Sequence, residues 1–286
     1  MIQSMTGFGK ATLQLPTKKI TIEVKSLNSK GLDLNVRMPS LYREMELGLR
    51  NLIASKLERG KIDFSIYIES TAEQTSTRVN VPIVKAYINQ LLEVYPDADT
   101  TELMKMAVRM PDTMKVEREE IDESEWATIQ NVIEEALQNI LNFRKDEGES
   151  LEKEFQLRIG NIRQFMNEAL ALDPERVQAI KERLQTAIAE LQVNVDENRF
   201  EQELIYYLEK LDITEEKVRL TNHLDYFLDT IKGTEANGRK LGFITQEMGR
   251  EINTMGSKSN HAQMQKLVVQ MKDELEKIKE QVLNVL

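Results

Sequence analysis

The first 70 residues alternate hydrophobic and polar positions with the period of two that is typical of β-strands. Within one such run, Ile20, Ile22 and Val24 would face one side of a sheet, while lysine, threonine and glutamate side chains face the other. Four strands are predicted in this way, at residues 11–15, 18–28, 32–39 and 60–70. The polar stretch Asn28–Gly31 is interpreted as a hairpin turn between the second and third strands.

Helical periodicity replaces this alternation in most of the remaining chain. Asp173 and Pro174 should end the longest predicted helix, since proline fits the first turn of the helix that follows. We expect these two helices to pack against each other as an antiparallel arm. The predicted helices span residues 40–58, 82–94, 100–108, 124–172, 174–193 and 260–285.

The last predicted helix repeats hydrophobic residues at alternating spacings of four and three, which is a heptad seam. The seam consists of Met264, Val268, Met271, Leu275, Ile278, Val282 and Val285. Such a seam packs either on another helix of the same chain or on a second subunit. The pattern leaves both possibilities open.

Together these elements predict an α+β protein with three parts. Residues 1–122 would form an N-terminal strand-rich domain with a packed helix. Residues 123–196 would form a long helical arm, and residues 197–286 a C-terminal helical domain.

Composition narrows the class of protein. The 286-residue chain has no cysteine, which rules out disulfides and thiolate metal sites and favours a reducing compartment. Its first residues do not have the pattern of a signal peptide, and no run of 18 hydrophobic residues indicates a membrane span. We therefore expect a cytoplasmic protein with no membrane partner.

Charge is distributed unevenly along the chain. The whole chain has a net charge of −10, yet residues 1–62 carry 11 Lys and Arg against 5 Asp and Glu. The first segment is thus basic and the remainder strongly acidic. A phosphate chain could be attracted to the first segment, although ordinary surface variation would also explain the difference.

The stretch around residue 212 combines two carboxylates and an imidazole at helical spacing. Asp212 and Glu215 fit a helix capping box, while Asp212, Glu216 and His223 fall close to one helical face. Such a face could bind a divalent cation or transfer protons. A helix cap beside an ordinary surface histidine is the alternative.

The glycine-rich stretch at residues 238–260 contains a second group of charged residues. Glu247, Arg250 and Glu251 lie one helical turn apart and should share a face. They form either an intrahelical ion pair or a wall that holds a cation and a phosphate. The sequence shows no cysteine nucleophile, P-loop, G-x-S-x-G elbow or dinucleotide-binding fingerprint.

Seven motifs in order along the chain resemble the YicC/YloC family of bacterial cytoplasmic endoribonucleases. They are MIQSMTGFGKA, VKSLNSKGLDLNVRMP, RGKID, RKDEGESL, DITEEKVRLTNHL, GRKLGFITQEMGREINTMGSKSN and KDELEKIKEQVLNV. The resemblance implies cleavage of single-stranded RNA with a divalent cation, Mn²⁺ or Mg²⁺. It also implies a ring-like or cage-like homo-oligomer, hexamers being the known form.

Among the polar positions that match the family motifs, we assign three sets of candidate site residues from their chemistry. The catalytic candidates are His223, Glu247, Arg250 and Glu251. The RNA-binding candidates are Asn28, Lys30, Arg37, Arg219, Arg239 and Lys258. The metal-ligand candidates are Asp212, Glu216, Glu247 and Glu251.

Two glycines depart from the family pattern. Relatives often have Asp where Gly242 stands and Asn where Gly249 stands. This departure supports an alternative function, a non-catalytic RNA-binding cage or adaptor that presents RNA to other RNA-degradation proteins. A purely structural coiled-coil oligomer is a third possibility, but it leaves the polar stretch at Asn28–Gly31 unexplained.

Overall fold

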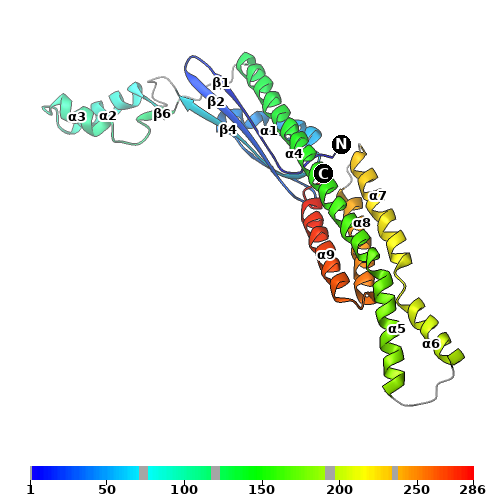
Figure 1. Cartoon of the computed structure of the whole chain (residues 1–286). Helices are drawn as coiled ribbons and strands as arrows, with labels where there is room; N and C mark the ends of the chain where they lie inside the picture. The colour runs from blue at the N-terminus through cyan, green and yellow to red at the C-terminus, as the bar shows by residue number, and fades with distance from the viewer. Residues whose placement is uncertain (1, 71–76, 117–122, 191–196, 234–237) are drawn as a thin grey trace.

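The computed structural model describes residues 2–70, 77–116, 123–190, 197–233 and 238–286 and shows an elongated, bent molecule (Figure 1). Its strands are β1 (Gly7–Gln14), β2 (Lys18–Leu27), β3 (Leu32–Arg37), β4 (Gly60–Ser70), β5 (Thr77–Val79) and β6 (Met114–Val116). Its helices are η1 (Ser40–Met45), α1 (Glu46–Lys56), α2 (Val81–Val94), α3 (Thr100–Ala107), α4 (Glu123–Ala171), α5 (Asp173–Glu190), α6 (Glu197–Lys210), α7 (Thr214–Lys232), α8 (Gly238–Lys258) and α9 (Ala262–Val282). The predicted α+β class is confirmed. No helix in the described ranges is long and apolar enough to cross a membrane.

The main sheet has the strand order β1-β2-β4-β3. β1, β2 and β4 are antiparallel neighbours, whereas β3 runs parallel to β4 at the edge. The predicted hairpin between β2 and β3 is therefore wrong, because β4 lies between them. Side chains fix the connection instead: Asn28 donates a hydrogen bond to the Leu283 carbonyl at 2.5 Å, and Arg59 donates one to the Ser29 carbonyl at 2.9 Å.

The inner face of this sheet packs against α1 and α4. Its core contains Ile22 and Phe64 from the strands and Ile133 and Ile140 from α4. Two glycines in β1 permit the close approach of α4, since a Cβ on Gly9 would lie 2.2 Å from the Ala136 carbonyl oxygen. Packing against α4 therefore explains the glycines of the N-terminal motif.

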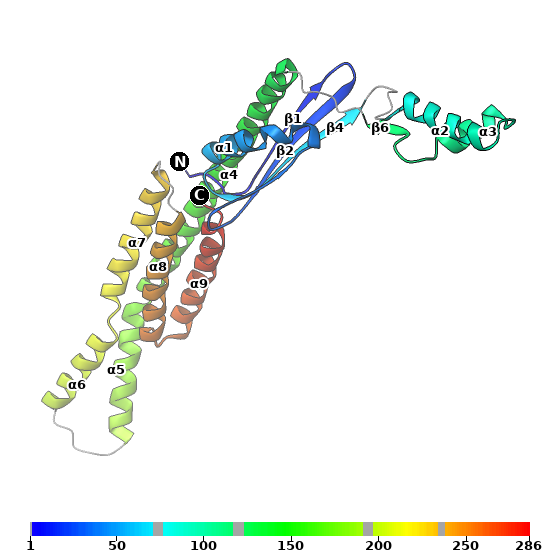
Figure 2. The same cartoon turned by 180° about the vertical axis from the view of Figure 1, so that it is seen from behind.

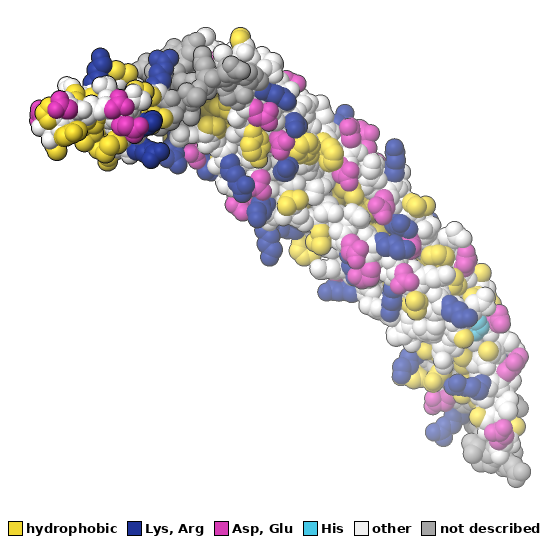
Figure 3. All heavy atoms as spheres, turned by 90° about the vertical axis from the view of Figure 1, so that its left-hand side faces the viewer, with side chains coloured by type: hydrophobic (Ala, Val, Ile, Leu, Met, Phe, Trp, Pro, Cys, Tyr) yellow, Lys and Arg dark blue, Asp and Glu magenta, His cyan; other side chains and the backbone are white. Residues whose placement is uncertain are grey.

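A small lobe of β5, β6, α2 and α3 projects from the sheet end of the molecule (Figure 1). Among its described residues, the buried hydrophobic side chains are Val84, Leu103 and Ala107. Hydrophobic side chains gather on the surface of this lobe (Figure 3). So small a core does not normally hold an isolated unit together, and the lobe exposes surface that a partner could cover.

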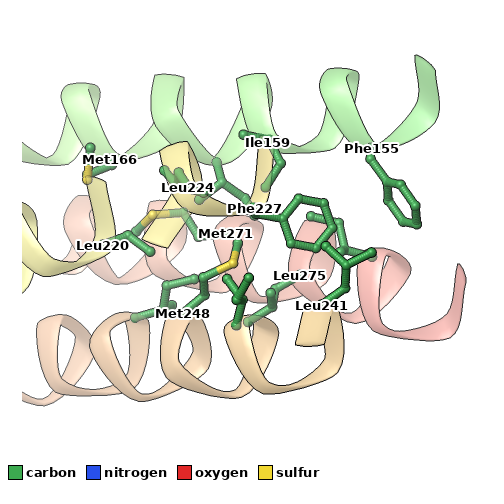
Figure 4. Packing of buried hydrophobic residues seen from close by; sticks show 14 of the residues in the cluster. Phe155, Ile159, Met166, Leu220, Leu224, Phe227, Leu241, Met248, Met271 and Leu275 are labelled. Atoms are coloured by element: carbon green, nitrogen blue, oxygen red, sulfur yellow. The ribbon is translucent and has the colours of Figure 1, made fainter. Parts of the chain in front are cut away.

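Helix α4 forms part of both main packing units. Its first half lies on the sheet, and its second half joins α7, α8 and α9 in a four-helix bundle. Figure 4 shows Phe155 and Ile159 of α4 among side chains of the other three helices. The segment predicted as an arm therefore supplies much of both cores.

The heptad seam of α9 is buried inside its own chain. Met271 and Leu275 lie in the bundle core, and every residue of the seam is at most 5% exposed (Figure 4). The subunit contact is therefore the wrong one of the two possibilities for this seam. The heptad pattern alone does not identify the helices against which α9 packs, whereas the folded structure does.

Helices α4 and α5 do not form the antiparallel pair that the sequence predicted. Only Leu172 separates them, and α5 continues beyond the end of α4 (Figure 2). A single residue is too short a connection to reverse the chain between two packed helices. The projecting arm is formed by α5 and α6, which enclose a mainly apolar pocket lined by Leu184, Ile188, Phe200, Leu204 and Tyr207.

The two chain termini meet at the junction of the sheet and the bundle (Figure 1). Ser4 and Val285 form an antiparallel bridge, and the Met5 amide donates to the Asn284 carbonyl at 2.7 Å. Gly148 of α4 lies against this bridge, since a Cβ there would be 2.1 Å from the Ile2 carbonyl oxygen. The ends of the chain thereby tie the two units together.

Candidate functional site

The N-terminal end of α7 places Asp212 and Glu216 beside the C-terminal end of α8. Asp212 accepts hydrogen bonds from the Thr214 hydroxyl at 2.7 Å and the Thr214 amide at 3.1 Å. The side-chain bond from Thr214 is the main cause that holds the pKa of Asp212 below its ordinary value. Glu215 does not complete the predicted capping box and pairs with Arg219 instead. The Asp212 carboxylate therefore accepts hydrogen bonds from Thr214, the first residue of α7.

Lys258 connects α8 to α7 through an ion pair that is partly buried. Its Nζ lies 2.8 Å from Glu216 Oε1 and 2.8 Å from the main-chain oxygen of Asp212. Glu216 is 4% exposed, and its second oxygen accepts no hydrogen bond from any described residue. Lys258, which was predicted to bind RNA, therefore makes a contact within the chain instead.

Two side chains that the sequence analysis did not select bind the carbonyl groups at the end of α8. Arg176 donates to the Lys258 carbonyl at 3.0 Å, and Gln265 donates to the Ser259 carbonyl at 2.7 Å. These donors satisfy carbonyls that a helix terminus leaves unpaired. No local sequence pattern indicates these contacts, because Arg176 lies on α5 and Gln265 lies on α9.

Apart from Gly238 at its first position, α8 has three glycines, which lie seven residues apart at positions 242, 249 and 256. A Cβ on Gly256 would be 3.0 Å from Val268, so glycine lets α9 approach closely there. Gly249 and Gly242 have more room: a Cβ would lie 3.4 Å from Leu275 at the first and meet nothing within 4 Å at the second. Packing thus requires small residues at only one of the three positions.

The charged residues in the middle of α8 divide between its surface and its buried side. Arg250 Nη1 lies 2.7 Å from Glu247 Oε1, and their side chains are 73% and 40% exposed. Glu251 is only 8% exposed and makes no hydrogen bond or ion pair with any described residue. Of the four predicted metal ligands, Glu251 is the one without such a partner in the described part of the chain.

Helical geometry places His223 at the level of Glu251. Helices α7 and α8 are antiparallel (Figure 4), and Glu216 meets Lys258 at one end of their contact. Two helical turns from that pair, about 10.5 Å along both axes, lie His223 on α7 and Glu251 on α8. His223 is half-buried and has no hydrogen-bond partner among the described residues. These two residues form the centre of the candidate site.

The remaining RNA-binding candidates are spread over the molecule. Lys30 and Arg37 are exposed near the open edge of the sheet. Arg239 is exposed at the start of α8, and Arg219 is exposed on α7. Asn28 anchors the chain end through Leu283 rather than pointing freely into solvent. The structure does not gather these residues into one patch.

The predicted metal ligands do not form a single closed set. Within the described ranges, no three His, Asp or Glu side chains are arranged to hold a metal ion. The carboxylate oxygens of Glu251 nevertheless suit Mg²⁺ or Mn²⁺, which often use one or two carboxylates together with substrate phosphates and water. These residues are therefore better suited to a cation that is held partly by RNA than to a cation held by protein ligands alone.

Comparison with known proteins defines the class as RNA-cleaving enzymes. A model of the N-terminal region of YicC-like endoribonucleases matches residues 2–153, and a model of their C-terminal region matches residues 169–286. The chain therefore belongs to the YicC-like endoribonuclease family.

Two curated relatives match over the full length of both chains. The probable endoribonuclease YicC of Clostridioides difficile is 33% identical over 293 residues. The probable endoribonuclease YicC of Haemophilus influenzae is 30% identical over 288 residues. The family resemblance inferred from the motifs is confirmed.

Proposed function

We propose that this protein is an endoribonuclease that cuts single-stranded RNA with the help of Mn²⁺ or Mg²⁺. The family assignment supports the RNA-cleaving class. The main observation behind the proposed site is that His223 on α7 and Glu251 on α8 lie at the same level along the axes of the two helices. The Glu251 carboxylate is buried and has no partner among the described residues, and the His223 imidazole is half-buried. Arg250, which precedes Glu251 in the sequence, is exposed.

Each residue of this site has a distinct task in the proposal. His223 takes the proton from the attacking water, which is the usual role of a positioned imidazole. Arg250 binds a phosphate oxygen of the RNA, and Glu247 orients the guanidinium through their ion pair. Glu251 would hold the cation, which supplies a more acidic bound water and offsets negative charge on the reacting phosphate.

The enzyme is proposed to work as a homo-oligomer in the cytoplasm, with a hexamer as the expected form. The buried seam of α9 is already occupied within the chain, so another surface must hold the subunits together. The lobe of α2 and α3 is the better candidate, since Val94, Tyr95 and Met104 are each more than half exposed there. Apolar surface of this kind is typical of contacts between subunits.

An RNA-holding adaptor is the second candidate function. It is favoured by the engagement of Asp212, Glu216 and Glu247 in contacts within the chain. Such a protein would bind RNA and leave it intact.

Incubation of the purified chain with end-labelled single-stranded RNA tests both candidates. We expect internal cuts with Mn²⁺ or Mg²⁺ and none with a chelator. Equal cutting in the chelator would contradict metal dependence. Bound but uncut RNA under every condition would favour the adaptor. The mass of the purified protein, measured by light scattering, tests the oligomer.

A further inference from the structure

The outer face of the main sheet is free of any described element. Helices α1 and α4 both pack on the inner face, where the buried residues of β2 and β4 point. Alternation along the strands therefore directs a second set of side chains away from them. An open antiparallel face carries mainly polar side chains, because it is in contact with water.

Two aromatic side chains depart from that expectation. Phe8 of β1 is 41% exposed and Tyr67 of β4 is 49% exposed, both on the outer face. Phe8 stands between Gly7 and Gly9, which face α4, so packing against the helix does not explain the aromatic ring. Thr21 and Ser65 are the small neighbours of Tyr67 on this face, and Glu23 of β2 lies between the two rings.

Basic side chains surround the aromatic rings. Lys25 of β2 is opposite Phe8 in the register, and its Nζ lies 5.7 Å from the ring centroid. Lys10 and Lys25 share a single acidic partner, Glu23. The outward basic side chains of the face are Lys10, Lys19, Lys25, Arg37 and Lys61. The outward acidic ones are Glu23, Asp33, Asp63 and Glu69.

Charge favours this face over the rest of the chain as a place for RNA. Its outward charged side chains are five basic and four acidic residues, whereas the whole chain has a net charge of −10. A polyanion is therefore repelled less by this face than by the acidic remainder of the chain. Alternating aromatic and basic side chains are also the usual combination in surfaces that bind single strands.

We propose that single-stranded RNA lies across this outer sheet face, with bases stacked on Phe8 and Tyr67 and phosphates near Lys10, Lys25 and Arg37. The two rings are roughly 16 Å apart, from four residues along a strand and two strand spacings. They therefore contact different nucleotides of one strand. Stacking on a ring needs an unpaired base and tolerates any base, so binding should select single strands and depend little on sequence. This inference rests on the proposed function, since it names where that RNA substrate binds.

Aromatic substitutions test the inference through binding of a fluorescent single-stranded RNA in chelator, where cutting is suppressed. Phe8→Ala and Tyr67→Ala should each weaken binding about fivefold or more. Phe8→Tyr and Tyr67→Phe keep a ring and should bind normally. Tyr206→Ala, at a tyrosine that is 64% exposed on α6, is the matched control and should change nothing.

A salt titration separates stacking from charge. Lys25→Ala should lower the salt dependence of binding by roughly 0.7 in logarithmic slope, the single-strand value for one phosphate contact. The two alanine variants at the aromatic positions should keep the wild-type slope. Unchanged affinity in both of these folded variants would overturn the proposal.

Cleavage with Mn²⁺, measured on the same proteins, keeps this inference distinct from the proposed function. At subsaturating RNA, Phe8→Ala and Tyr67→Ala should cut more slowly in proportion to their weaker binding, whereas Tyr206→Ala should cut at the wild-type rate. If wild type cuts RNA and both variants bind as it does, only the sheet proposal fails. If wild type neither binds nor cuts RNA, the proposed function fails with it.

Discussion

The α7–α8 hairpin and the outer sheet face use their polar residues in opposite ways. On the hairpin, Lys258 and Glu216 bind each other across the helix contact. On the sheet face, Lys25 and Arg37 remain exposed and no described element covers them. Both regions had candidate site residues, yet only the second offers a broad surface to a ligand.

This difference shows what helical spacing leaves undecided. Residues one turn apart share a face, but the neighbours of that face depend on the tertiary structure. Glu247 and Glu251 illustrate the point, since the first is 40% exposed in its side chain and the second is buried. Strand alternation is more informative here, because one face of a sheet packs on helices and the other does not.

The largest expected effect concerns the interior of the bundle. Met271→Glu should destabilise the protein by about 3 kcal/mol or more, because it puts an unpaired charge in a packed apolar core. Val269→Glu, on the same helix at a side chain that is 54% exposed, should change stability by less than about 0.5 kcal/mol. Denaturant unfolding followed by circular dichroism measures both. A folded Met271→Glu protein of reduced oligomeric mass would instead show that the seam holds subunits.

A smaller effect is expected at the ion pair between the two helices. Lys258→Met should cost about 2 kcal/mol, since it leaves the buried Glu216 carboxylate without its cation. Lys279→Met removes an exposed pair with Glu276 and should cost well under 1 kcal/mol. A double variant with Glu216→Gln should recover part of the loss. Equal stability of the two lysine variants would mean that the buried pair has no special role.

The α4–α9 contact should make part of the bundle stability dependent on acid pH. Burial raises the pKa of Glu274, but hydrogen bonds from Lys277, Asn161 and Arg158 outweigh it and leave the pKa below its ordinary value of 4.5. A carboxylate with a lowered folded pKa stabilises the protein above its unfolded pKa, and this contribution is lost as pH falls through the folded value. Glu274→Gln should therefore flatten the stability profile below about pH 4.5. A profile that matches wild type in urea unfolding between pH 3 and 6 would contradict this.

Much of the local structure follows from the sequence, but the pairing of elements does not. The strands at 18–27 and 60–70 and the helix at 262–282 match the predicted periodicities closely. The insertion of β4 between β2 and β3 depends on contacts between distant residues, which no local pattern records. The same holds for the placement of α5 and α6 around a common pocket.

The candidate site was predictable in part. The motifs select His223, Arg250 and Glu251, because polar residues at helical spacing are visible in a sequence. They cannot show that Lys258 is used internally, since its partner Glu216 lies 42 residues away. Phe8 and Tyr67 were not selected at all. Alternation could have marked both as outward-facing aromatic residues once the covered face of the sheet was known.

The most direct test compares Glu251→Gln with Glu247→Gln in single-turnover cleavage of labelled single-stranded RNA at saturating protein. We expect Glu251→Gln to lower the rate at least about 100-fold, the scale for losing a group that supports a metal ion. Glu247→Gln should stay within about threefold, because a half-exposed pair of this kind contributes little. RNA affinity should change little in either variant, because the proposed stacking contacts on the sheet lie outside α8. Wild-type cleavage by a folded Glu251→Gln protein would contradict the account.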